Sequence, residues 1–324
     1  MLSRVADSTY WMSRYLERAE HTTRLLDVNL NLALEESSTS ADRRWQRMIA
    51  ALGNPRGVKW TGDAAELTHA LTFDTEVGSS ILSCILAARE NARHVREQIS
   101  TEQWQRLNRL YLQVTRTEAQ YRHGEFDSEQ LGDFLQSITE AVQQFQGVTD
   151  STMSHGEGWQ FIQVGRYMER ASATVMLLEV YHHDLWARRG RATEGNEYLE
   201  WIGLLRCATA FEAYCKVYTA DFTPERILEF LLLDAEFPHS VRFSIDALQH
   251  GLEAIHGDVG KRRAEPLSRL AGRVQASLSY ANVDEILAQD VIAYLHSILV
   301  QCREIHQMLY QLYINYSIQA ALAG

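Results

Sequence analysis

The chain has 324 residues, with 31 Lys and Arg against 42 Asp and Glu and a formal net charge of −11. This acidic balance disfavours a general nucleic-acid binder or a protein that coats anionic membranes, although a local basic cluster can still hold a small anion. Only four prolines occur, and Ala, Leu, Glu, Gln and Arg are abundant, which is typical of a chain that is helical throughout.

The first predicted helix runs from about Ser8 to Glu36, and it carries charged residues where burial is expected. One face of its helical wheel is apolar and should pack in the core: Trp11, Tyr15, Ala19, Leu26, Leu30 and Ala33. The opposite face is polar, and we expect it to be solvated: Ser13, Glu20, Arg24 and Asn31. A third set lies on a flank that Leu25, Val28 and Leu32 continue, and it therefore needs buried partners: Arg14, Glu17, Arg18 and His21.

The six-residue segment 14–19 returns as segment 166–171, with five of the six residues identical. The order of later motifs also recurs, which predicts an internal duplication. We expect a first repeat over residues 1–152 and a second over 153–324, together forming one compact helical domain. The predicted fold class is all-α, a duplicated helical bundle. Its two repeats are related by a pseudo-two-fold axis, with the two Glu-Arg helices paired centrally.

Apolar periodicity predicts further helices after the first one. Their approximate bounds are 45–52, 81–99, 101–123, 128–148, 157–188, 201–218 and 283–317. No alternation of the kind that strands require extends over any length. The longest apolar run near the end, 291–300, is too short to span a bilayer. We expect a soluble, cytoplasmic protein with reduced, mostly buried cysteines.

The repeated Arg-x-x-Glu-Arg pattern needs partners outside its own helix. Adjacent residues on a helix do not face each other, so Glu17 cannot simply neutralise Arg18. The structural hypothesis is that each carboxylate crosses to the other helix: Glu17 to Arg170 or Arg166, and Glu169 to Arg18 or Arg14. Such pairs would fix the register between the two halves.

The same residues are also candidates for a ligand site. Four arginines against two glutamates leave excess positive charge, which suits a carboxylate or a phosphate. Arg89, Arg93 and Arg96 lie along one edge of the helix 81–99, and they either form a solvated edge or contact an anion. The candidate catalytic residues are Glu17 and Glu169. The candidate substrate-binding residues are Arg14, Arg18, Arg166, Arg170, Arg89 and Arg93.

Several other chemistries find little support in the sequence. There is no Walker loop and no GxGxxG segment, so any ATP chemistry has to come from a partner. The four cysteines are scattered without a CxxC pair. Glu253-x-x-His256 has the spacing of a carboxylate-bridged di-metal site, but the duplicated position offers no matching pair. We therefore predict no metal and no cofactor.

Motifs along the whole length resemble those of the alpha-E family, a bacterial family of predicted α-helical proteins named for its Glu-Arg motif. The resemblance rests on the two Glu-Arg pairs, on Ala-Ala-Arg-Glu-Asn-Ala-Arg at 87–93 and on Glu-Phe-Pro-His-Ser-Val-Arg at 236–242. Members of that family are typically encoded beside circularly permuted ATP-grasp proteins and transglutaminase-like proteases. The resemblance therefore implies a pathway that forms and trims amide bonds on a peptide or a peptide-like metabolite.

The leading interpretation is a helical component of such a pathway. It would bind an anionic peptide-like substrate or product and act with an ATP-grasp ligase, and in some cases with a transglutaminase-like protease. One alternative is a structural adaptor whose Glu-Arg pairs only hold the halves together. Another is a transferase in which Glu17 or Glu169 is a general base, a role that needs a raised carboxylate pKa and that neighbouring arginines oppose.

Overall fold

The computed structural model describes residues 3–33, 38–123, 128–186, 194–219 and 221–315. Within these ranges the chain forms helices and no strand, which confirms the all-α class. The helices are α1 (Ser3–Ala33), α2 (Ser38–Ala51), α3 (Ala64–Thr72), α4 (Ile81–His94), α5 (Thr101–Arg122), α6 (Ser128–Thr152), α7 (Glu157–Tyr181), η1 (His182–Trp186), α8 (Glu194–Cys207), α9 (Phe211–Tyr218), α10 (Pro224–Leu233), α11 (Val241–Ser279), α12 (Val283–Leu287), α13 (Val291–Leu309) and η2 (Tyr310–Ile314).

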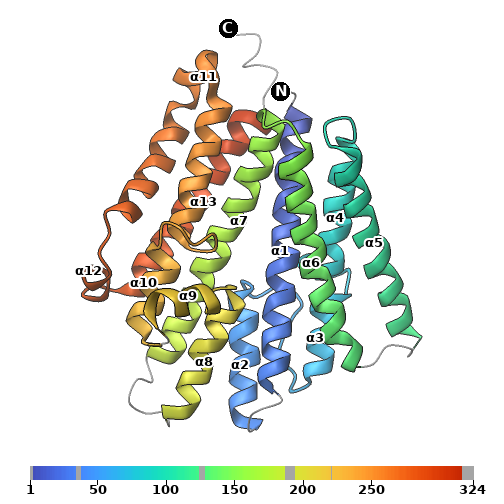
Figure 1. The fold of residues 1–324 in the computed structure, drawn as a ribbon, viewed down its shortest axis with the longest axis vertical. Coiled ribbons are helices and arrows are strands. Elements are labelled where there is room, and N and C mark those ends of the chain that lie inside the picture. Colours follow the sequence, from blue (N-terminus) through green and yellow to red (C-terminus); the bar gives the residue numbers. More distant parts are fainter. Residues whose placement is uncertain (1–2, 34–37, 124–127, 187–193, 220, 316–324) are drawn as a thin grey trace.

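Helices α1 and α7, which carry the two Glu-Arg pairs, pack on each other at the centre of the bundle (Figure 1). They run in the same direction from the top of the view. Helices α4 and α6 pack on α1, and α11 and α13 pack on α7, so that both central helices are covered. The elements of the two halves follow a similar order, and the predicted internal duplication rests on this order and on the repeated segment.

The expectation that one face of α1 is solvated is wrong for most of that face. Ser13, Glu20 and Arg24 are buried, whereas Asn31 is exposed. The helical wheel failed because it assumes a helix with one covered side, and α1 has neighbours on several sides. Its polar residues therefore have partners inside the protein. The Ser13 hydroxyl, for example, donates a hydrogen bond of 2.6 Å to the carbonyl oxygen of Ile162 on α7.

Several predicted helices are shorter than expected or are interrupted. The helix expected over 201–218 breaks between α8 and α9, where Thr209 has a left-handed φ of 52°. The helix expected over 283–317 divides into α12, α13 and η2, because Asp290 caps the N-terminus of α13. The helix expected over 81–99 ends at His94. The expected helix ends at Glu36, Arg188 and Ser317 lie outside the described residues.

Helix α11 consists of two arms that lie side by side. The Nε2 atom of Gln249, on the first arm, is 3.8 Å from the position that a Cβ would take on Gly272, on the second arm. In a straight helix these residues would lie roughly 35 Å apart. The orange ribbon in Figure 1 follows this fold-back at the top of the bundle. The first arm packs towards α7, and the second arm continues to α12.

The crossing of α1 and α7 depends on small residues at the point of closest approach. A Cβ on Gly165 would lie 2.4 Å from the carbonyl oxygen of Tyr10 and 3.3 Å from the Cβ of Ser13. A methyl group at that position meets backbone, which has no rotamer to change. Because Gly165 directly precedes the second Arg-Tyr-x-Glu-Arg segment, this close contact places the charged residues of α7 against those of α1.

We predict that Gly165→Ala lowers the free energy of unfolding by about 1–3 kcal/mol, because the added Cβ forces the two central helices apart. Gly147→Ala is the matched control, since Gly147 lies in α6 with no atom within 4 Å of its Cβ position. That variant should instead gain about 0.5–1 kcal/mol from helix propensity. Urea denaturation of both variants measures the difference. Equal stabilities would contradict the close-contact account.

Candidate functional site

The carboxylate of Glu169 on α7 accepts hydrogen bonds from two arginines of α1. Arg14 Nε donates to Oε2 at 2.7 Å, and Arg18 Nε donates to Oε1 at 2.6 Å. Arg14 is held from the other side by aromatic rings, because its guanidinium lies 4.7 Å from the Trp11 ring centroid and its Nη1 donates to the Tyr10 hydroxyl at 3.2 Å. Both oxygens of this buried carboxylate are therefore satisfied.

The carboxylate of Glu17 on α1 makes the reciprocal contact with α7. Arg170 donates from Nε to Oε1 at 2.5 Å and from Nη2 to Oε2 at 3.0 Å, which is a bidentate pair. A further hydrogen bond of 3.3 Å runs from Arg170 Nη1 to the carbonyl oxygen of Pro238. Each Glu-Arg helix thus supplies a carboxylate to the arginines of the other, as the crossed-pair hypothesis predicts.

The two halves of this network differ at Arg166. By sequence it corresponds to Arg14, but its Nη1 donates to Gln163 Oε1 at 3.2 Å and no ion pair to Glu17 is formed. Gln146 of α6 approaches Glu17 and Glu20 instead, with Nε2 to oxygen distances of 3.4 and 3.3 Å. The network is therefore asymmetric, although the sequence pattern that produces it is repeated.

The ionisation of Glu169 reflects a competition between burial and the neighbouring arginines. Burial alone would raise the pKa of this carboxyl. The charges and hydrogen bonds of Arg14 and Arg18 outweigh that effect and lower the pKa to about 2. Glu169 is therefore ionised at neutral pH and is a poor proton acceptor. Glu20 differs, because burial dominates there and raises its pKa despite the adjacent Arg24.

Two histidines beside the Glu17 side of the network are neutral. Burial and the charge of Arg24 lower the pKa of His21 to about 4. Burial, followed by the charge of Arg170, places the pKa of His239 well below its usual range. These side chains, with Glu17 and Arg24, border a cavity of about 10 Å³, which is room for roughly one water molecule. This small cavity is too narrow for a peptide.

The predicted anion contacts on α4 are engaged with α4 and α5. Arg89 Nε donates to Asn108 Oδ1 at 3.0 Å, and its guanidinium lies 4.3 Å from the ring centroid of Tyr111. Arg93 is exposed and pairs with Glu90 at 2.9 Å. The structure thus brings Arg14, Arg18 and Arg170 together with Glu17 and Glu169, and it gives Arg89 and Arg93 other partners.

Sequence reasoning missed residues that reach the network from distant segments. The Tyr10 hydroxyl and His306 Nδ1 are 2.9 Å apart, and His306 Nδ1 is also 3.3 Å from Arg14 Nη1. The i, i+4 spacing of Tyr10 and Arg14 is a signal for that contact. His306 and Gln146 carry no such signal, because they reach the network through tertiary packing. The side chain of His256, in the weak di-metal pattern, lies outside the described residues.

A family model described as a predicted alpha-helical domain with a conserved ER motif matches residues 1–314. The chain belongs to the Alpha-E family. An uncharacterized protein of Mycobacterium bovis and two of Mycobacterium tuberculosis are similar to it, each 24% identical over 300 residues. The match covers 87% of this chain and 33% of each relative, so the chain spans about a third of their length. No solved structure matches the chain.

Within the described ranges, no helix combines the length and the apolar character that crossing a bilayer requires.

We predict that Glu169→Gln removes a pH-dependent part of the stability. The folded pKa of Glu169, about 2, lies below its ordinary value of 4.5, so its contribution is complete above the ordinary value and is lost as the pH falls towards 2. The difference in the free energy of unfolding between the unaltered protein and Glu169→Gln should shrink by about 3 kcal/mol from pH 6 to pH 2. Urea denaturation across this range measures it. A constant difference would show that the ion pairs do not hold Glu169 ionised.

Proposed function

We propose that this chain is a non-catalytic helical component of an amide-bond-forming pathway in the cytoplasm. It binds an anionic peptide-like substrate or product and acts with an ATP-grasp ligase. A transglutaminase-like protease is the second proposed partner. In this proposal the Glu-Arg network holds the two halves of the protein in register.

The observation that carries the non-catalytic role is the saturation of both carboxylates by arginines of the opposite helix. A general base needs a pKa near the working pH and a lone pair directed at its substrate. Glu169 has a pKa of about 2 and both of its oxygens are occupied, which argues against the transferase alternative. Glu17 has the same kind of partner in Arg170.

The length of the relatives supports a role as one component among several. In the mycobacterial proteins, the part similar to this chain makes up about a third of the polypeptide. The remaining two thirds are therefore tethered to an Alpha-E segment. A tether keeps two modules at high effective concentration, which favours partners that work together.

A second candidate function keeps a ligand at the Glu-Arg network itself. Five arginines, Arg14, Arg18, Arg24, Arg166 and Arg170, stand against the carboxylates of Glu17, Glu20 and Glu169, which leaves positive charge in excess. The Arg18 side chain is 28% exposed, compared with 13% for Arg14 and 7% for Arg170. Arg18 is thus the most accessible arginine of the crossed pairs, and an anion from solvent would approach there.

Two substitutions separate these roles. Arg170→Met should lower the free energy of unfolding by about 3–5 kcal/mol, because it leaves the Glu17 carboxylate buried without its cation. Arg18→Met should cost only about 1–2 kcal/mol, because Glu169 keeps Arg14 and the Arg18 side chain is nearer to solvent. Urea denaturation measures both changes. Equal effects would contradict the order of burial in the network.

The same Arg18→Met protein then tests the function. The chain should copurify with its ATP-grasp ligase, and folded Arg18→Met protein should support ATP-dependent product formation at the unaltered rate. Loss of product formation in folded Arg18→Met protein would instead establish the network as a ligand site. If the unaltered chain neither copurifies with the ligase nor changes its product formation, the proposed role in the pathway is wrong.

A further inference from the structure

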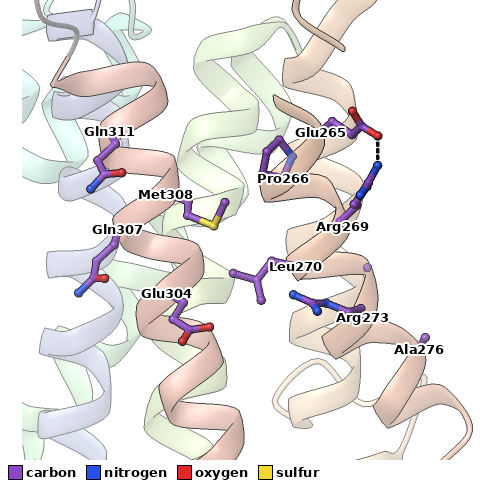
Figure 2. Close-up of a pocket in the computed structure, with 11 residues that line it drawn as sticks. Glu265, Pro266, Arg269, Leu270, Arg273, Ala276, Glu304, Gln307, Met308 and Gln311 are labelled. Carbon is purple, nitrogen blue, oxygen red and sulfur yellow. Dashed lines mark hydrogen bonds and ion pairs between the residues drawn. The ribbon is translucent and has the colours of Figure 1, made fainter. Parts of the chain in front are cut away.

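A groove of about 870 Å³ lies between the second arm of α11 and the C-terminal half of α13 (Figure 2). Its volume is within the range of small-molecule sites, roughly 300–1,000 Å³. Leu270 from α11 and Met308 from α13 project into the gap and form an apolar floor. Charged and amide side chains line the two walls: Glu265, Arg269 and Arg273 on α11, Glu304 and Gln307 on α13, and Gln311 on η2.

The charged groups of this groove are only partly paired. Arg269 forms an ion pair with Glu265 on its own helix. Arg273 and Glu304 form no ion pair with any described residue, and in Figure 2 they face each other across the gap with Leu270 between them. The cation of Arg273 on one wall therefore lies opposite the carboxylate of Glu304 on the other wall, and the two side chains do not reach each other.

Two outer helices of the first half, α5 and α6, are bridged by side chains. Helices α5 and α6 are joined by side-chain hydrogen bonds from Gln103 to Thr149 at 3.0 Å and from Gln113 to Ser137 at 2.6 Å. In the α11–α13 pair, the four polar residues Arg273, Glu304, Gln307 and Gln311 make no hydrogen bond with one another. The polar side chains on the two walls of the groove are therefore left unpaired with one another, unlike those that bridge α5 and α6.

Opposed single charges above an apolar floor suit a zwitterion. Guanidinium binds carboxylate through paired N–H donors, and a carboxylate binds an ammonium group. An α-amino acid carries both groups on one carbon, so that it can bridge two walls that do not touch. Gln307 and Gln311 also line the groove, and their amides can donate to and accept from an amide in the ligand.

We propose that this groove binds the zwitterionic head of an amino acid, or of a side-chain-linked peptide that retains a free α-ammonium and a free α-carboxylate. Arg273 receives the carboxylate, Glu304 receives the ammonium group, and the chain of the ligand lies over Leu270 and Met308. The inference rests on the proposed binding of a peptide-like molecule and gives that molecule a site away from the Glu-Arg network.

The test uses the full chain and L-glutamine, whose side-chain amide represents a side-chain-linked peptide bond. We expect saturable binding by isothermal titration calorimetry. N-acetyl-L-glutamine and L-glutaminamide should each bind at least about tenfold more weakly, because each leaves one charged wall without its partner. Arg273→Ala should weaken L-glutamine at least about tenfold and no longer distinguish it from L-glutaminamide. Glu304→Ala should also weaken L-glutamine binding at least about tenfold, and it should no longer distinguish L-glutamine from N-acetyl-L-glutamine.

Arg109→Ala is the matched control, because it removes an exposed arginine from α5, which does not line the groove. It should bind L-glutamine as the unaltered chain does. Absence of saturable L-glutamine binding, or equal binding of the three ligands, would overturn the proposal. A third result would also overturn it: the unaltered chain binds no L-glutamine, and Arg273→Ala protein no longer copurifies with the ligase. The groove would then be a protein interface. None of these calorimetric results depends on the ligase, so failure of the groove and failure of the pathway role are distinguishable.

Discussion

The fold depends on the need to pair charges that the crossing of α1 and α7 removes from water. An unpaired carboxylate or guanidinium in a protein interior costs several kcal/mol, so each charge at this crossing constrains where the opposite helix lies. Ser13 and Gly165 set how near the helices come, and the crossed pairs of Glu17 and Glu169 set how they are rotated. The remaining helices pack around this centre.

Buried ion pairs of this kind are weak evidence for net stability. Their attraction is offset by the desolvation of both partners, and replacement by well-packed apolar residues is often neutral. The effect of these pairs on the register of α7 against α1 is separate from their effect on net stability. A shift of α7 by one residue would turn its side chains by about 100°, and would separate Glu169 and Arg170 from their partners at once. The repeated Arg-x-x-Glu-Arg pattern thus selects one alignment of two otherwise similar helices.

Part of this arrangement follows from the sequence, because i, i+3 and i+4 spacing places Arg14, Glu17 and Arg18 on one flank of a helix. A polar cluster on a flank that is otherwise apolar requires partners, and the second copy supplies them. The burial of Glu20 and Arg24 cannot be predicted in this way, because a helical wheel contains no information about how many other helices pack against the helix. The apolar pattern continues across Thr209, so it does not predict the break in the helix there.

The groove between α11 and α13 has no counterpart in the sequence pattern. Arg273 and Glu304 lie on exposed positions of two helices, and only the fold-back of α11 brings them to opposite walls. The difference between Arg166 and Arg14 also depends on tertiary contacts, because Gln146 approaches Glu17 from α6 where an ion pair with Arg166 would be expected from the repeat. Repeated sequence therefore predicts the shared centre of this protein. Its differences between the two halves arise from tertiary contacts.

The most direct test of the central claim is a double-mutant cycle on Glu17 and Arg170, with Glu17→Gln, Arg170→Met and the double variant compared by urea denaturation. If the crossed pair fixes the helices, the double variant should be more stable than the sum of the single effects allows, with a coupling free energy of about 2 kcal/mol or more. Additive effects, with coupling near zero, would contradict a register set by this ion pair.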